Sequence, residues 1–228
     1  MIYVLSDIHG NERRFCSILR QISLREEDTL YVLGDVIDRY PGGIRILRKI
    51  MAMPNAKMLL GNHEYMMLRA LGFPRDDNRD DGGAMAHWYR NGGKVTHDYF
   101  KHLRKSLRQE IIEYLLSVAV NVDITVKGKN YKLVHAAPVE RYDLDPRYKN
   151  PVYYAIWKRY RGDYIPCEDY TMVFGHTPTK YFQDNAPMEI WYADGMIGID
   201  CGSGYPEDGF GRLACLRLDD GKVFYSEE

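Results

Sequence analysis

The sequence has 228 residues and a mass of 26.6 kDa, a size typical of one domain, so we expect a single domain over residues 1–228. Its 31 basic and 32 acidic residues leave a formal net charge of −1, without the basic excess of nucleic-acid-binding proteins, so we predict no nucleic-acid partner. No apolar run reaches membrane-spanning length, and the N-terminus lacks the basic segment of a signal peptide, so we expect no membrane partner and a cytoplasmic protein.

Three strand-turn-helix units follow one another at the start of the chain. Short apolar runs predict the strands, at residues 2–5, 29–33 and 56–60. Apolar residues at helical spacing predict a helix after each strand, at 12–22, at 44–51 and from residue 65 onward. The turns after the strands contain Asp7, Asp35 and Asn62, which are 28 and 27 residues apart. Each interval fits one strand-helix-strand unit with a right-handed crossover, so we predict parallel strands.

The rest of the chain predicts helices first and short strands later. The helical patterns lie at residues 84–89, 96–103 and 107–117. The expected strands lie at residues 118–126, 131–134, 172–174, 189–193, 196–199, 211–218 and 223–226. We expect a hairpin turn at Gly128–Asn130, and a solvated loop rather than a flap at residues 73–83. Early helices and late antiparallel strands favour an α/β fold (α+β in some schemes), a two-sheet β-sandwich flanked by helices.

Eight polar side chains come at or just after the ends of predicted strands. Open α/β sheets place their chemistry at this carboxyl edge, so we expect these side chains to lie together. Carboxylate, amide and imidazole groups without a thiolate suit manganese, iron, zinc or magnesium. The eight residues are Asp7, His9, Asp35, Asp38, Asn62, His63, His135 and His176.

The charges of this set suit two cations and a phosphate. Two divalent cations would outweigh Asp7, Asp35 and a bridging hydroxide by one positive charge, which attracts a dianionic phosphate. A carboxylate in place of Asn62 would cancel that attraction. Two cations about 3.5–4 Å apart can activate a water and hold both oxygens of an in-line displacement.

Five blocks of the sequence resemble those of the calcineurin-like metallophosphoesterases, most closely the phosphoprotein-phosphatase branch in its compact bacterial and phage form. The family blocks GDxHG, GDxxDRG, GNHE, H(G/A) and GH correspond to Ser6–Gly10, Gly34–Tyr40, Gly61–Glu64, His135–Ala136 and Gly175–His176. The resemblance covers residues 1–202 and implies the metallophosphoesterase fold. Tyr40 stands where the family usually has glycine, and Ala136–Ala137 also departs from many members, and both positions bear on substrate fit.

The resemblance implies a centre of two divalent cations. The first cation would be bound by Asp7, His9 and His176, and the second by Asn62 and His135. Asp35 would bridge the two cations. Manganese is the first expectation, with iron, zinc or magnesium as alternatives.

The resemblance also implies a general acid for the reaction. His63 would protonate the leaving oxygen, and Asp38 would orient its imidazole and raise its pKa.

The substrate phosphate would be bound by arginines together with Asn62. Arg39 would hold phosphate oxygens in a fork, and a second arginine would be Arg159 or Arg141. Residues 87–93 also look like a family feature near the mouth of the site.

Several polar and aromatic residues receive an ordinary structural interpretation. Glu64 is expected to begin a helix, favourably for its dipole, and residues 200–202 to form a turn with a packing role. The histidines at 87, 97 and 102 match no block and are expected to be structural or exposed. Seven tyrosines between residues 140 and 170 would form an aromatic wall for a phosphopeptide or nucleobase, or fill the core and rim, which we favour.

The predicted function is that of a dinuclear metal-dependent phosphoester hydrolase, in which a metal-bridging hydroxide attacks phosphorus directly. A serine/threonine phosphoprotein is the first expected substrate, and phosphotyrosine activity is left open. The alternative is a bis(5'-nucleosyl)-tetraphosphatase, a hydrolase of dinucleoside polyphosphates, so the expected partner is a phosphoprotein or a phosphorylated small molecule. A non-catalytic scaffold is the third interpretation, which the set His63, Asp38 and Arg39 argues against. The sequence gives no indication of the oligomeric state.

Overall fold

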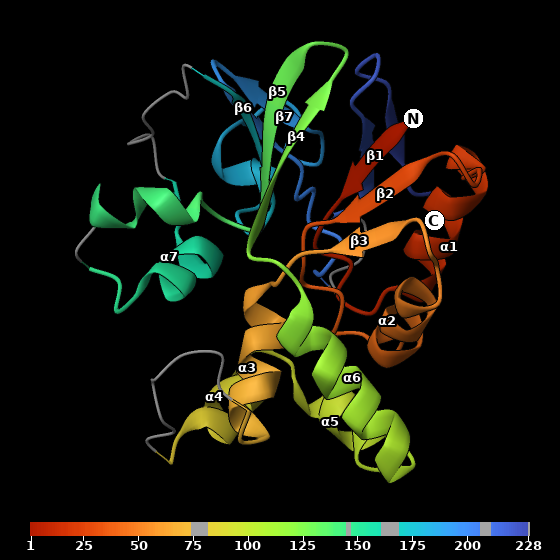
Figure 1. Ribbon diagram of the computed structural model, residues 1–228, viewed down its shortest axis with the longest axis vertical. Helices are drawn as coiled ribbons and strands as arrows, with labels where there is room; N and C mark the ends of the chain where they lie inside the picture. The colour runs from red at the N-terminus through yellow and green to blue at the C-terminus, as the bar shows by residue number, and fades with distance from the viewer. Residues whose placement is uncertain (74–81, 145–146, 161–168, 206–210, 228) are drawn as a thin grey trace.

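The computed structural model describes residues 1–73, 82–144, 147–160, 169–205 and 211–227 (Figure 1). Two five-stranded sheets pack against each other, and helices cover their outer faces. This confirms the predicted two-sheet sandwich flanked by helices. Most of the loop expected at residues 73–83 lies outside the described residues.

The first sheet is built on the three predicted parallel strands, in the order β10-β9-β1-β2-β3. Strands β1 (Ile2–Leu5), β2 (Thr29–Val32) and β3 (Ala56–Met58) are parallel neighbours. Strand β9 (Ala214–Arg217) pairs antiparallel with β1, and β10 (Val223–Tyr225) extends the sheet beyond it. The chain therefore ends in the sheet in which it begins.

The second sheet has the order β4-β5-β6-β8-β7. Its strands are β4 (Asn121–Val126), β5 (Lys129–Val134), β6 (Thr171–Phe174), β7 (Trp191–Ala193) and β8 (Met196–Gly198). The hairpins β4–β5 and β7–β8 are antiparallel, as expected for the late strands, but β5, β6 and β8 run parallel. The parallel trio forms a second carboxyl edge.

The larger apolar core of the described residues lies between the first sheet and its helices, and a second core lies between the two sheets. Successive residues of β1 point to opposite faces. Val4 packs between the sheets with Leu133 and Val173 of the second sheet, whereas Tyr3 and Leu5 face the helices. Because both faces of the first sheet are covered, its central strands carry unbroken apolar runs.

The helices fall into groups around the sheets (Figure 1). Their bounds are Glu12–Ile22 (α1), Gly43–Met51 (α2), Asn62–Ala70 (α3), Ala84–Arg90 (α4), Lys94–Phe100 (α5), Lys105–Ser117 (α6) and Pro151–Trp157 (α7). Helices α1, α2, α3 and α6 share the core on the outer face of the first sheet, and α7 covers the second sheet through Tyr154. The 3-10 turns η1 (Val139–Leu144) and η2 (Thr179–Tyr181) follow β5 and β6.

The structure differs from the sequence predictions at a few boundaries. The β4–β5 turn lies at Lys127 and Gly128, because both have positive φ angles, of 49° and 78°, so β5 begins two residues earlier than expected. Strand β4 begins at residue 121 rather than 118, and β9 at residue 214 rather than 211. Helix α7 was not predicted, although Asn150 caps it and Pro151 opens it.

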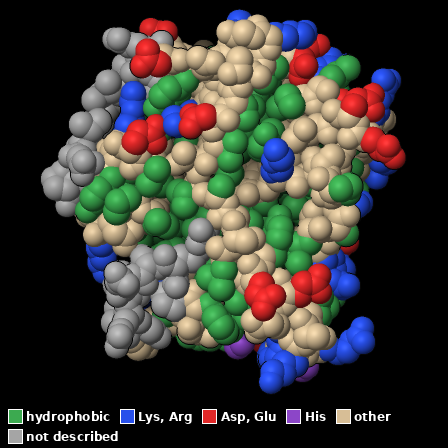
Figure 2. Space-filling view, in the orientation of Figure 1, with side chains coloured by type: hydrophobic (Ala, Val, Ile, Leu, Met, Phe, Trp, Pro, Cys, Tyr) green, Lys and Arg blue, Asp and Glu red, His purple; other side chains and the backbone are tan. Residues whose placement is uncertain are grey.

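On the face shown in Figure 2, acidic and basic side chains are interspersed. This arrangement matches the near-zero formal net charge of −1. Among the described residues, no helix combines the length and the apolar character that crossing a bilayer requires.

Candidate metal centre and active site

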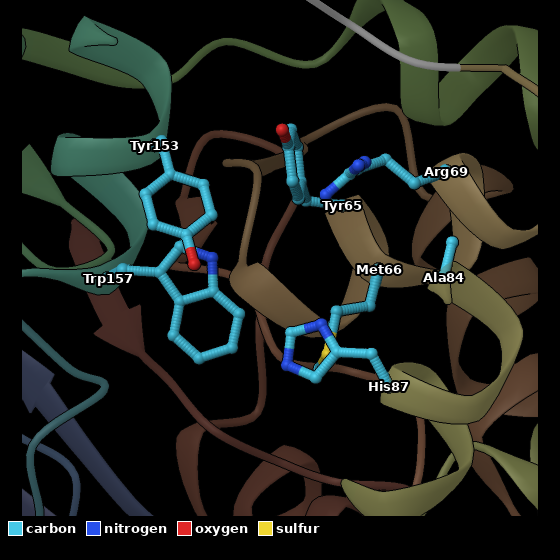
Figure 3. Close-up of a pocket in the computed structure, with 7 residues that line it drawn as sticks. All are labelled: Tyr65, Met66, Arg69, Ala84, His87, Tyr153 and Trp157. Carbon is cyan, nitrogen blue, oxygen red and sulfur yellow. The ribbon is translucent and has the colours of Figure 1, made fainter. Parts of the chain in front are cut away.

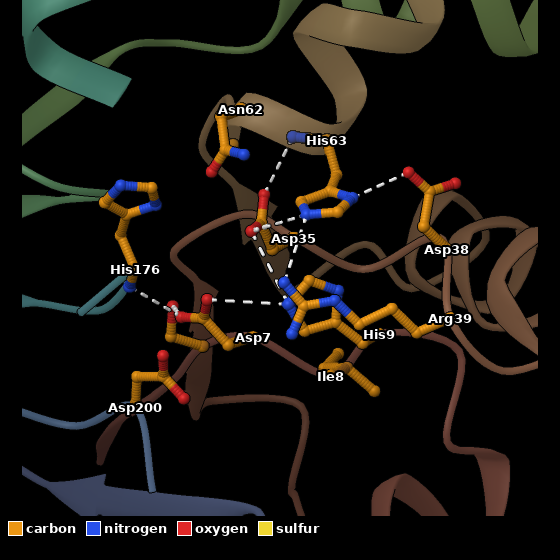
Figure 4. A network of polar contacts seen from close by, with 12 residues as sticks. Asp7, Ile8, His9, Asp35, Asp38, Arg39, Asn62, His63, His176 and Asp200 are labelled. Atoms are coloured by element: carbon orange, nitrogen blue, oxygen red, sulfur yellow. Dashed lines mark hydrogen bonds and ion pairs between the residues drawn. The ribbon is translucent and has the colours of Figure 1, made fainter. Parts of the chain in front are cut away.

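The eight predicted site residues meet at the adjoining carboxyl ends of the two sheets, and seven of them are labelled in Figure 4. All eight are buried, and none is more than 4% exposed. The turns after β1 and β2 and the start of α3 supply six of them, and the ends of β5 and β6 supply His135 and His176. The sequence prediction that these side chains lie together is confirmed.

The backbone is strained where it presents these groups. Among the described residues, eight non-glycine residues have positive φ, and six of them belong to the site: Asp7, His9, Asp35, Asp38, Arg39 and His176. Such conformations cost about 1–3 kcal/mol each and persist only where surrounding contacts impose them. The strain is concentrated at the site.

Glu64 imposes much of this geometry. Its buried carboxylate accepts hydrogen bonds from the backbone N–H groups of Asp35 (2.9 Å), Val36 (2.8 Å) and Gly61 (3.2 Å). A side chain at Gly61 could not fit, because a Cβ there would lie 2.3 Å from the Asp35 backbone nitrogen. The expectation that Glu64 only begins α3 was therefore incomplete, since it also fixes the turn after β2.

Three imidazoles are held by backbone carbonyls. The Nδ1–H of His9 donates to the carbonyl of Ile37 (3.2 Å), and that of His135 donates to the carbonyl of Leu33 (2.7 Å). His176 likewise hydrogen-bonds the Trp157 backbone. Burial lowers the pKa of His9 and of His176 well below the usual range, and Arg39 and Arg159 respectively add to this. A neutral ring with Nδ1–H engaged leaves the Nε2 lone pair available to a metal.

Several of these lone pairs face oxygen atoms that are also acceptors. A cation between them would turn this repulsion into attraction. The Nε2 atom of His135 lies 2.9 Å from Asn62 Oδ1 and 3.6 Å from Asp35 Oδ1. The Nε2 atom of His9 lies 3.6 Å from Asp35 Oδ2. The Nε2 atom of His176 is buried and has no hydrogen-bond partner among the described residues. The donors therefore fit divalent cations.

Two triads of candidate ligand atoms share Asp35, as expected of a bridging carboxylate. Within each triad the ligand atoms lie within 4.8 Å of one another. Among the described residues, one triad combines Asp35 with His135 and His176, whereas the prediction grouped His176 with Asp7 and His9. The reason is the sheet order, which places β6 directly beside β5. Asp7 instead accepts the backbone N–H of His176 (2.9 Å).

The other triad contains His9, Asp35 and His63, but His63 is held differently (Figure 4). Its Nδ1 donates to Asp38 Oδ2 (2.7 Å), the same oxygen that accepts the indole N–H of Trp88 (2.9 Å). Burial opposes the charged imidazolium, but the carboxylates of Asp35 and Asp38 outweigh it and raise the His63 pKa. The raised pKa is compatible with the proton-donor role that the resemblance implies for His63. The feature predicted at residues 87–93 thus contributes through Trp88.

The predicted phosphate-binding arginines lie at different places. An Nη of Arg39 lies 3.4 Å from His63 Nε2, and Arg39 is exposed to solvent. Arg159 donates from Nη1 to the carbonyl of His176 (3.1 Å), which brings it to the edge of the site. Arg141 lies in η1, where its backbone N–H donates to the Pro138 carbonyl (3.0 Å). The contact with the His176 carbonyl supports Arg159 as a candidate for the second arginine.

Asp200 was expected only in a packing turn, yet it belongs to the carboxylate cluster (Figure 4). It is 5% exposed and lies beyond the end of β8, the third parallel strand of the second sheet. Burial, with Asp7 adding to it, raises the Asp200 pKa well above the usual range. Its signal in the sequence was its position directly after the apolar run 196–199.

The aromatic residues are mainly structural. Six of the seven tyrosines between residues 140 and 170 pack in or against the cores, as favoured from the sequence, and Tyr164 lies outside the described residues. His87 stacks on Trp157 with centroids 5.8 Å apart, and His97 hydrogen-bonds the Tyr89 hydroxyl. His87 and Trp157 line a pocket with Tyr65 and Tyr153 (Figure 3). It encloses about 10 Å³, the room one water needs, so it does not admit a nucleobase in this conformation.

Comparisons with known proteins identify relatives of this chain. The chain is 23% identical over 194 residues to the symmetrical bis(5'-nucleosyl)-tetraphosphatase of Paracidovorax citrulli (strain AAC00-1). That match covers 84% of this chain but 62% of the relative, so the chain spans under two thirds of the relative's length.

Two solved structures share the fold. One is described as a candidate diadenosine tetraphosphatase, with a TM-score of 0.62 and 19% identity over 98% of this chain and 91% of that one. The other is a protein serine/threonine phosphatase of Saccharomyces cerevisiae, with a TM-score of 0.62 and 12% identity over 100% and 79%. Finally, the sequence profile of the calcineurin-like phosphoesterases matches residues 1–199. The chain therefore belongs to the calcineurin-like phosphoesterase family.

Proposed function

We propose that the protein is a metal-dependent hydrolase of dinucleoside polyphosphates, with bis(5'-nucleosyl) tetraphosphates as its first candidate substrates. The observation that carries this choice is the match over 84% of the chain to a relative named for that activity. It changes the preference from a phosphoprotein, the first expectation from the sequence, to the alternative. The buried cluster of carboxylates and imidazoles supports the broader assignment to metal-dependent phosphoester hydrolysis.

Two divalent cations bound by this cluster would activate a water and neutralise the phosphate that it attacks. Asp35 would be shared between them, with Asp7 and His9 on one side and the other side completed by Asn62, His135 and His176. The cluster is almost fully buried, so its electrostatic interactions are stronger than they would be in water. Manganese stays our first candidate for both positions.

The protein's own residues supply binding and proton transfer. Arg39, beside His63 Nε2, would hold oxygens of the attacked phosphate, and Arg159 would approach from the His176 side. His63 would pass its Nε2 proton to the leaving oxygen while Asp38 keeps the ring oriented and charged. A non-catalytic scaffold would have no use for this acid.

A phosphoprotein stays a second candidate because of the acid. The alkoxide that leaves a phosphoserine is a strong base and needs a proton, whereas a nucleoside diphosphate leaves from an anhydride with less help. The pair His63 and Asp38, with a 2.7 Å hydrogen bond, would be of greatest use on the ester.

The test is a substrate panel on the purified full chain with Mn²⁺. It compares kcat/KM for diadenosine tetraphosphate, a phosphoserine peptide and p-nitrophenyl phosphate, and separates the nucleotide products by chromatography. We expect the tetraphosphate to be preferred and to give two molecules of ADP. A higher kcat/KM for the phosphopeptide would refute the proposed substrate and favour the second candidate.

A further inference from the structure

Lys180 and Arg39 both lie close to the ring of Tyr205. The Lys180 Nζ lies 4.2 Å from the ring centroid of Tyr205 and 5.3 Å from that of Tyr181. The Arg39 guanidinium carbon lies 5.8 Å from the same Tyr205 ring. We call Tyr40, Lys180, Tyr181 and Tyr205 the Tyr205 cluster. Lys180 is therefore a second positively charged side chain at the ring that Arg39 also faces.

The loop that carries Tyr205 lies directly on the metal centre. A Cβ at Gly204 would be 2.2 Å from His9 Cδ2 and 2.7 Å from Arg39 Nη1, so only glycine permits this approach. The Tyr40 hydroxyl donates to the Tyr205 carbonyl (3.0 Å) and so ties this loop to the turn after β2. Tyr40 occupies the position where the family usually has glycine, which has no side chain to make this bond.

Lys180 is also fixed relative to the metal ligands. It follows His176 by four residues and lies in η2, behind Thr179, which is fully buried. The Thr179 N–H donates to the Asp200 carbonyl (2.8 Å), and its hydroxyl donates to the Pro187 carbonyl (2.9 Å). The backbone next to Lys180 is therefore fixed, and the ammonium group contacts two aromatic rings.

We propose that the Tyr205 cluster is a second phosphate subsite, in which Lys180 binds the phosphate next to the one being attacked. A phosphomonoester has no such group, whereas each further phosphate of a polyphosphate brings negative charge that the metal centre does not neutralise. Lysine offers a compact cation with three donors for those oxygens. The naming of a nucleoside polyphosphate rests on the proposed function, but the preference for adjacent phosphates does not.

The experiment replaces Lys180 and uses Lys222 as the matched control. Lys222 also lies over an aromatic ring, 4.9 Å from the Phe224 centroid, but belongs to the β9–β10 hairpin. For Lys180→Ala we expect kcat/KM on diadenosine tetraphosphate to fall at least about tenfold more than on p-nitrophenyl phosphate, because a charged hydrogen bond is lost. Tyr205→Leu should show the same selectivity, and Lys222→Ala should not.

A second measurement uses inhibitors of p-nitrophenyl phosphate hydrolysis and requires no cleavage of a nucleotide. Lys180→Ala should weaken inhibition by inorganic tripolyphosphate about tenfold more than inhibition by orthophosphate. If the wild type ignores the tetraphosphate but this selectivity is present, the proposed function fails and the subsite stands. Equal losses for both inhibitors, or no loss, overturn the subsite even if the tetraphosphate is the substrate.

Discussion

Four imidazoles lie in one buried cluster, and they differ in the group to which the ring N–H donates a hydrogen bond. His9, His135 and His176 each hydrogen-bond a backbone group. The Nε2 atoms of His9 and His135 lie near carboxylate or amide oxygens, and that of His176 is buried with no hydrogen-bond partner in the described part of the chain. His63 instead donates to the Asp38 carboxylate, which favours the charged ring. We propose that this difference reflects two roles, with His9, His135 and His176 as cation ligands and His63 as the proton donor.

The largest effect should come from the carboxylate that serves both sides of the cluster. Asp35→Asn should lower kcat/KM by about 10⁴-fold, because binding and activation by the cations contribute several kcal/mol. Metal content, measured by inductively coupled plasma mass spectrometry, should fall with it. The control is Asp123→Asn, an exposed carboxylate on β4. A fully metallated Asp35→Asn protein would refute the shared ligand.

Removing the proton donor should cost less and depend on the leaving group. His63→Asn should lower kcat on a phosphoserine peptide by about 10²-fold, the lower range for general acid catalysis, and on diadenosine tetraphosphate by less. Rates of both reactions under saturating Mn²⁺ check this, with exposed His102→Asn as the control. If the phosphopeptide rate were unchanged, His63 would not be the acid.

Glu64 fixes the turn after β2 that carries Asp35, so replacing Glu64 should lower the free energy of unfolding. Glu64→Gln places an NH₂ group against backbone donors and should lower the free energy of unfolding by about 2 kcal/mol. Urea unfolding of the metal-free proteins measures it, with the exposed Glu113→Gln as the control. A change within about 0.5 kcal/mol, typical of surface substitutions, would remove the structural role of Glu64.

The smallest predicted change concerns pH. Burial lowers the His63 pKa, and the carboxylates of Asp35 and Asp38 more than offset this, so Asp38→Asn should lower it again. Because the acid must be protonated, the alkaline limb of the kcat profile should move to lower pH, by about one unit. The control is Asp98→Asn, which pairs with surface lysines of α5 and the turn after it. An unmoved limb would mean that Asp38 does not tune His63.

The sequence was most informative where spacing is local. The units that deliver Asp7, Asp35 and Asn62 follow from the period of the apolar residues and the length of each crossover. The turns themselves were visible because polar residues interrupt apolar strands. The three parallel strands of the first sheet and the convergence of their ends could therefore be predicted from the sequence.

Features that depend on distant segments could not be predicted in the same way. The placement of His176 beside His135 follows from β6 lying next to β5, which no local pattern indicates. Glu64 resembled a helix-start residue because its backbone partners on the β2 turn lie 27 to 29 positions away. Asp200 was read as a turn for the same reason, since its neighbour Asp7 is at the other end of the chain.

Metal stoichiometry tests the division of the imidazoles most directly, because His63 lies within a triad that could in principle hold a cation. The measurement is the number of Mn²⁺ ions bound per chain in His63→Asn and in His135→Asn, after equal loading and gel filtration. We predict that His63→Asn keeps the wild-type content while losing turnover, and that His135→Asn loses metal. Loss of metal in His63→Asn would contradict the assignment and make His63 a ligand.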